Sequence, residues 1–99
     1  TDEVNMKAIV SVLGKDKKGI IARVSGALYD MDVNVEDLSQ TILQDYFTMI
    51  MAVEMGDNSP KFEEIKSRLR ELGENIGVQI NIQIKDIFDA MHRIDTPAR

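Results

Sequence analysis

A change of hydrophobic period across a glycine-bounded loop restricts the fold of this chain more than any other feature of its sequence. Residues 7–13 are apolar on both faces of an extended strand, which is typical of a central strand. After Gly14 and Gly19 the apolar residues recur at helical spacing and form one stripe: Ile20, Val24, Ala27, Leu28 and Met31. A strand therefore leads directly into a helix over 20–32, and we expect Gly26 of this helix to pack closely on the sheet or on a neighbour.

The middle of the chain predicts a β-hairpin. Strand patterns cover 33–43 and 46–55, and Gln44-Asp45 between them is short enough for a tight turn. The phase of the first strand slips near Glu36-Asp37, which indicates a β-bulge. The second strand is apolar on both faces, and one row is expected in the core or in a dimer interface: Met49, Met51 and Met55.

The last third of the chain predicts a second helix and an edge strand. A helical stripe over 60–75 follows an Asn58-Ser59-Pro60 start signal, in which Ser59 or Asn58 would cap, and ends at Gly73 or Gly77. Residues 78–85 alternate between apolar and polar, as in an edge strand with one buried face and one solvent-exposed face. A short C-terminal helix is expected from the apolar residues that follow: Ile87, Phe88, Met91 and Ile94.

This order of elements predicts an α+β fold, the ferredoxin-like βαββαβ sandwich. Its four-stranded antiparallel sheet would have the order 4-1-3-2 with both helices on one face, because strands 7–13 and 46–55 are apolar on both sides. We expect a single domain over 6–94, with flexible tails at 1–5 and 95–99.

Two helices would leave the second face of the sheet uncovered, although 46–55 presents an apolar row there. An uncovered apolar face usually marks a contact surface. We therefore expect a homodimer or a higher homo-oligomer, with the C-terminal segment packed into the interface. The alternative is a monomer in which that segment alone folds back over the face. Pairing of two copies edge to edge and pairing face to face are both open.

The composition excludes several classes of function. A net charge of −5 over 99 residues argues against direct nucleic-acid binding and against an anionic membrane surface. No cysteine is present, so disulfides and thiol chemistry are excluded. No run of about 18 apolar residues could span a membrane. We expect a cytoplasmic protein.

Catalytic and metal-binding motifs are missing as well. Gly14 and Gly19 have the spacing of a phosphate-binding loop, but Ile20-Ile21 stand where a lysine and a hydroxyl residue are required. His92 is the only histidine, so a zinc site would need several carboxylates. We expect no catalytic residue, no metal and no cofactor.

Four blocks of sequence, taken in order, resemble a known family. Residues 12–20, 33–41, 46–49 and 87–94 are similar to a stand-alone ACT domain. Specifically, the chain resembles a small single-domain ACT family without an assigned function, which is related to the ACT repeats of the glycine cleavage system transcriptional repressor. This resemblance implies a non-catalytic regulatory module that binds an amino acid or a related metabolite at a homodimer interface.

The resemblance also implies where a ligand would bind. In amino-acid-binding ACT domains the site is the loop after the first strand, and its positions correspond here to Gly14, Lys15, Asp16, Lys18, Gly19, Ile20 and Asn34. The ligand carboxylate would suit the helix N–H groups together with Lys15 or Lys18, and the ammonium would suit Asp16 and Asn34. Alternatively, Asp16 caps the helix, the lysines are a solvated charge run and Asn34 is a turn residue.

Two other functions stay open. A small acylphosphatase-like hydrolase needs an arginine that binds the anion and an asparagine that places the water, and the only candidates are Arg23 and Asn34. The other possibility is a dimerising scaffold that binds no small molecule.

Overall fold

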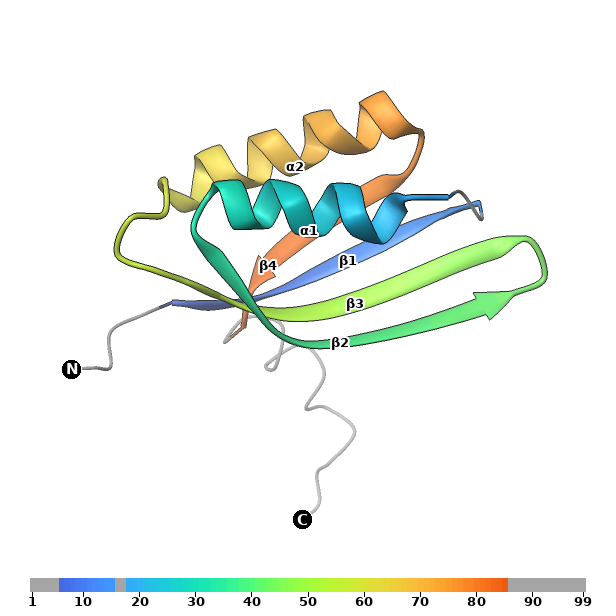
Figure 1. Ribbon diagram of the computed structural model, residues 1–99, viewed down its shortest axis with the longest axis horizontal. Coiled ribbons are helices and arrows are strands. Elements are labelled where there is room, and N and C mark those ends of the chain that lie inside the picture. The colour runs from blue at the N-terminus through green and yellow to red at the C-terminus, as the bar shows by residue number, and fades with distance from the viewer. Residues whose placement is uncertain (1–5, 16–17, 86–99) are drawn as a thin grey trace, which may run out of the picture.

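The expected order of strands and helices is confirmed. The computed structural model describes residues 6–15 and 18–85, with these elements: β1 (Lys7–Lys15), α1 (Ile20–Asp30), β2 (Val33–Leu43), β3 (Tyr46–Met55), α2 (Phe62–Ile76) and β4 (Gln79–Ile84). All strand pairs are antiparallel and the sheet order is β2-β3-β1-β4, which is the predicted order. Both helices lie on one face of the sheet (Figure 1). The expected C-terminal helix and both tails lie outside the described residues.

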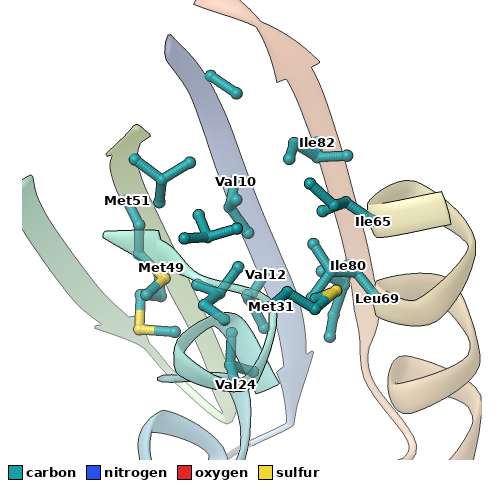
Figure 2. Packing of buried hydrophobic residues seen from close by; sticks show 14 of the residues in the cluster. Val10, Val12, Val24, Met31, Met49, Met51, Ile65, Leu69, Ile80 and Ile82 are labelled. Carbon is teal, nitrogen blue, oxygen red and sulfur yellow. The ribbon is translucent and has the colours of Figure 1, made fainter. Parts of the chain in front are cut away.

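The core fills the space between this sheet face and the two helices. Figure 2 shows side chains from β1, β3, β4 and both helices meeting in one layer. The strand alternation explains this layer, because every second residue of a strand faces the helices. The methionine row belongs to this core, since Met49 and Met51 are fully buried and Met55 is 6% exposed. Burial of one such side chain stabilises the fold by about 1.5–3 kcal/mol.

The β2–β3 hairpin contains the expected bulge and turn. Its register shifts between Val35 and Asp37, so Glu36 is the extra residue. The turn places Gln44 at a φ of 57°. The hairpin reaches past the helices (Figure 1), which leaves Ile42 59% exposed and Leu43 71% exposed.

Three glycines of the helices have different roles. Gly77, one of the two predicted glycines, ends α2 in the left-handed conformation, with a φ of 77°. Gly73 packs closely, because a Cβ there would lie 2.6 Å from the carbonyl oxygen of Val78. Gly26 does not pack on the sheet: it is exposed, and nothing lies within 4 Å of its Cβ position. The expectation of close packing at Gly26 is therefore wrong within this chain, because the glycine lies on the outer side of α1.

The start of α2 also differs from the expectation. Lys61 precedes the helix and no side-chain hydrogen bond caps it, so the prediction of a cap by Ser59 or Asn58 is wrong. The Ser59 hydroxyl instead donates to the carbonyl oxygen of Asp32 at 2.7 Å and accepts from the Gly56 amide at 2.9 Å. Ser59 thus ties the β3–α2 loop to the turn between α1 and β2.

Candidate ligand site at the start of α1

The N-terminus of α1 presents backbone donors to which no side-chain cap is bound among the described residues. Gly19 precedes the helix with a φ of 82°, a conformation that side chains with a Cβ rarely adopt. The first helical bond runs from the Arg23 amide to the Gly19 carbonyl at 2.9 Å. The N–H groups of Ile20, Ile21 and Ala22 precede this bond and have no partner within the helix. The first turn contains no acidic residue, so this end of the helix favours an anion.

A hollow of about 260 Å³ lies between the start of α1 and the end of α2. It is lined by one amide, two cations and two isoleucines besides the glycine: Lys18, Gly19, Ile20, Arg23, Asn75 and Ile76. The two helices run antiparallel, so the start of one meets the end of the other at this end of the sheet (Figure 1). The hollow therefore combines positive charge with a small apolar wall.

Three of the predicted site residues come together here, namely Lys18, Gly19 and Ile20. Sequence reasoning did not include Arg23 and Asn75 in this site. Arg23 follows Gly19 by one helical turn, and this spacing could have indicated it. Asn75 carries no such signal, because only the packing of α2 beside α1 brings it to the loop.

The strand part of the predicted site is engaged elsewhere. An ideal Cβ on Gly14 would lie 2.5 Å from Cγ1 of Val78, so the glycine is explained by packing. Lys15 Nζ lies 5.8 Å from the ring centre of Tyr46, on the sheet face away from the helices. Asp16 lies outside the described residues.

Asn34 lies at the opposite end of the sheet. It pairs with Glu54 on β3, which in turn pairs with Lys7 at the start of β1, whereas the loop follows Lys15 at the other end of that strand. Eight residues of strand separate these ends, which is roughly 26 Å. Asn34 lines a different hollow, of about 480 Å³, together with Tyr29, Asp30, Asp32 and Val33. One small molecule cannot contact Asn34 and Gly19 of the same chain.

Several charged side chains lie around the β-bulge near Asn34. Lys7 Nζ lies 3.3 Å from Oε1 of Glu36. The pKa of Glu36 is lowered from its ordinary value of 4.5, mainly by a side-chain hydrogen bond with Glu54, and further by the hydrogen bond and charge of Lys7. Partial desolvation acts in the opposite direction.

The described residues hold no group of three or more His, Cys, Asp or Glu that could bind a metal ion. In the same part of the chain, no helix has both the length and the apolar character needed to cross a bilayer.

Comparison with known proteins assigns the fold to a family. The family model described as ACT domain matches residues 7–83, which include all six elements except the last residue of β4. The chain belongs to the ACT-domain family. Its relatives include a UPF0237 protein of Clostridium acetobutylicum, 49% identical over 89 residues, which are 90% of this chain and all of that protein. A UPF0237 protein of Methanopyrus kandleri is 38% identical over 88 residues, or 89% of this chain and 98% of the relative.

Solved structures agree with the ACT fold. An ACT domain protein from Streptococcus pneumoniae superposes with a TM-score of 0.77 at 43% identity, covering 90% of this chain and all of that one. A chain that carries the name glycine cleavage system transcriptional repressor superposes with a TM-score of 0.73. That match is 16% identical and covers 83% of this chain and 47% of the other, so it shows the shared fold alone.

Proposed function

We propose that this ACT domain is a non-catalytic regulatory module that binds a small amino acid, or a related metabolite, between two copies of the chain. The observation that carries the proposal is the start of α1, which no described side chain caps and which opens into a hollow with Lys18 and Arg23. Backbone N–H groups, a helix dipole and two cations together suit a carboxylate. ACT domains are generally regulatory, which agrees with this chemistry.

The rest of the hollow suits the side chain of a small ligand. Ile20 and Ile76 supply apolar surface, and the Asn75 amide can donate or accept a hydrogen bond. About 260 Å³ is small for a binding pocket, since pockets for drug-sized ligands begin near 300 Å³. A single amino acid therefore fits better than a nucleotide. Asp16 remains a predicted contributor to ligand binding.

The ammonium of the ligand requires a second group, and the partner copy is its proposed source. Asn34 is too distant within one chain, at roughly 26 Å along the sheet. β2 is an edge strand, and its residues 38–43 carry no charge, so its free backbone groups can pair with another strand. Antiparallel pairing of β2 with its own copy places the start of one β2 beside the end of the other. Asn34 of the partner subunit then lies at the loop end of the first chain.

Such an arrangement makes the ligand a bridge between two chains. A ligand that binds one packing of the two copies better than another shifts the population toward that packing. The regulated target would sense this change in packing. The distance between Asn34 and the start of α1 also weakens the acylphosphatase-like alternative, because Arg23 and Asn34 of one chain cannot act on the same substrate.

The test is thermal unfolding of the purified protein against each of the twenty amino acids, with light scattering for the mass. A ligand at about 100 times its Kd stabilises the native state by about 2.7 kcal/mol. For a chain of this size that corresponds to a rise in Tm of about 10 °C or more.

Matched variants assign the response to the site. Arg23→Gln should abolish the rise, whereas Arg70→Gln on the exposed side of α2 should keep it. Asn34→Ala should weaken it, and Asn81→Ala, an exposed asparagine on β4, should not. A rise that survives Arg23→Gln would disprove this site. A dimer that responds to no amino acid would support the scaffold instead.

A further inference from the structure

The sheet face away from the helices, here called the open face, has an uncharged centre. Strand alternation places these residues on it: Ile9, Ser11, Leu13, Ser39, Thr41, Leu43, Tyr46, Thr48, Ile50, Ala52, Gln79, Asn81 and Gln83. Charged residues lie at its borders, with Lys7 and Glu54 at one end of the strands and Lys15 at the other. On the edge strand β2, Asp37 pairs with Ala52 and adds a carboxylate at that margin of the face. Leu13 is 46% exposed and Ile50 43% exposed, so the described part of the chain leaves apolar surface in contact with solvent.

The sequence after Lys85 has a pattern that matches this surface. Fourteen residues, 86–99, follow the last described residue. Four of them are large and apolar, and they recur at helical spacing on one side: Ile87, Phe88, Met91 and Ile94. The other side carries Asp89 and Arg93. An amphipathic segment of this kind needs an apolar surface to cover.

The place where this segment begins restricts where it can reach. β4 is an edge strand, and its last residue, Ile84, pairs with Ala8 near the start of β1. Eight residues in helical geometry span roughly 12 Å, which is about four residues of strand. A segment that turns back at Lys85 can therefore cover the adjacent half of the open face, near Ile9 and Ala52. It cannot reach Leu43 at the far corner of the sheet.

The length over which a relative aligns with this chain supports a structural role for this segment. The ACT family model ends at residue 83. The C. acetobutylicum relative aligns over 89 residues of this chain and over its own entire length. An alignment of 89 residues cannot fit within residues 1–85, so it includes at least four residues of the segment after Lys85. The relative shares this extension beyond the ACT core.

We propose that residues 87–94 dock on the open face of their own chain, over the neighbouring central strands β1 and β3. Docking buries the four apolar side chains against Ile9, Ile50 and Ala52 and leaves the β2 edge free. This interaction is independent of ligand binding and of dimerisation through β2. The uncovered remainder of the face, around Leu13 and Leu43, lies beyond the reach of the segment.

Thiol labelling tests the proposal directly, because the chain contains no cysteine. Ser11 and Ser39 lie on the open face and both pair with Ile50, one on β1 and the other on β2. Serine to cysteine is nearly isosteric, so Ser11→Cys and Ser39→Cys form a matched pair. Met91→Asp is then added to each variant to expel the segment. Arg93→Asp, on the opposite side of the helical pattern, is the control for added negative charge.

The expected result is slow labelling of Cys at position 11 that becomes about tenfold faster with Met91→Asp and unchanged with Arg93→Asp. Labelling at position 39 should be fast in every background. The rates should not depend on protein concentration, because the segment belongs to the same chain. Ala8→Cys, at a site that is 1% exposed in the core, should stay unlabelled and so report an intact fold.

Two results would overturn the proposal. Labelling at position 11 that does not respond to Met91→Asp would show that the segment does not cover the face. Protection that increases with protein concentration would assign the face to a second copy of the chain. If Met91→Asp exposes the core at Ala8→Cys, the milder Phe88→Ser replaces it in the same comparison.

Discussion

Val78 occupies the space that a side chain at residue 14 would need, because an ideal Cβ on Gly14 would lie 2.5 Å from Cγ1 of Val78. Gly14 ends the run of core-facing residues on β1, and Val78 immediately precedes β4. This contact joins the first strand to the last at the end of the sheet where the candidate ligand site lies. The glycine is therefore required for packing, whatever the loop binds.

Gly14→Ala should destabilise the fold by overpacking at this contact. Inserted methyl groups in a packed core typically cost about 1–3 kcal/mol. Urea unfolding of the two proteins measures the difference. Val78→Ala added to Gly14→Ala should recover part of the loss, because it removes the atom that the new Cβ meets. Full additivity of the two changes would contradict the contact.

Gly26→Ala should have the opposite effect. Gly26 lies in the middle of α1 with open space around its Cβ position, and alanine in a helix is more stable than glycine by about 0.5–1 kcal/mol. The free energy of unfolding should increase by that amount. A loss of stability, accompanied by a smaller mass in light scattering, would show instead that a second copy packs against this side of α1.

Ser59→Ala should loosen the connection between the two loops. The hydroxyl donates to the Asp32 carbonyl at 2.7 Å and accepts from the Gly56 amide at 2.9 Å. A hydrogen bond of this kind contributes about 0.5–1.5 kcal/mol net, so a loss of about 1–3 kcal/mol is expected for the pair. Ser67→Ala, at an exposed position of α2, is the matched control and should change stability little.

Stability should depend on pH through Glu36. Its pKa in the folded protein is lowered, first by the hydrogen bond with Glu54 and then by Lys7. The folded state therefore binds this proton less readily than the unfolded state. The resulting stabilisation is present above the ordinary, unfolded pKa of 4.5 and is lost as the pH falls through the lowered folded pKa.

Carbon-detected NMR titration of the Glu36 carboxyl measures this pKa. Lys7→Gln should move the pKa of Glu36 back toward 4.5, because it removes the ammonium that lies 3.3 Å away. Glu36→Gln should remove this part of the acid-induced loss of stability. An unchanged Glu36 titration in Lys7→Gln would contradict the ion pair.

The sequence by itself determined the elements and their order. The switch between periods of two and 3.6 residues depends on which side chains can be buried together, and this is a local property of the chain. The bulge at Glu36-Asp37 and the end of α2 at Gly77 were predictable for the same reason, because a slip of phase and a left-handed glycine are both read within a few residues. The sheet order followed from the two strands that are apolar on both faces.

Only the tertiary structure decided which distant residues meet. Ser59 binds a carbonyl 27 positions earlier in the chain and not the helix beside it, because the α1–β2 turn packs there. The packing of α2 beside α1 likewise brings Asn75 to the loop that follows β1. Asn34 and Gly19 are 15 positions apart in sequence but lie at opposite ends of the sheet, because α1 runs the whole way between them (Figure 1). Such contacts depend on how the elements stack in three dimensions, which no local pattern of residues specifies.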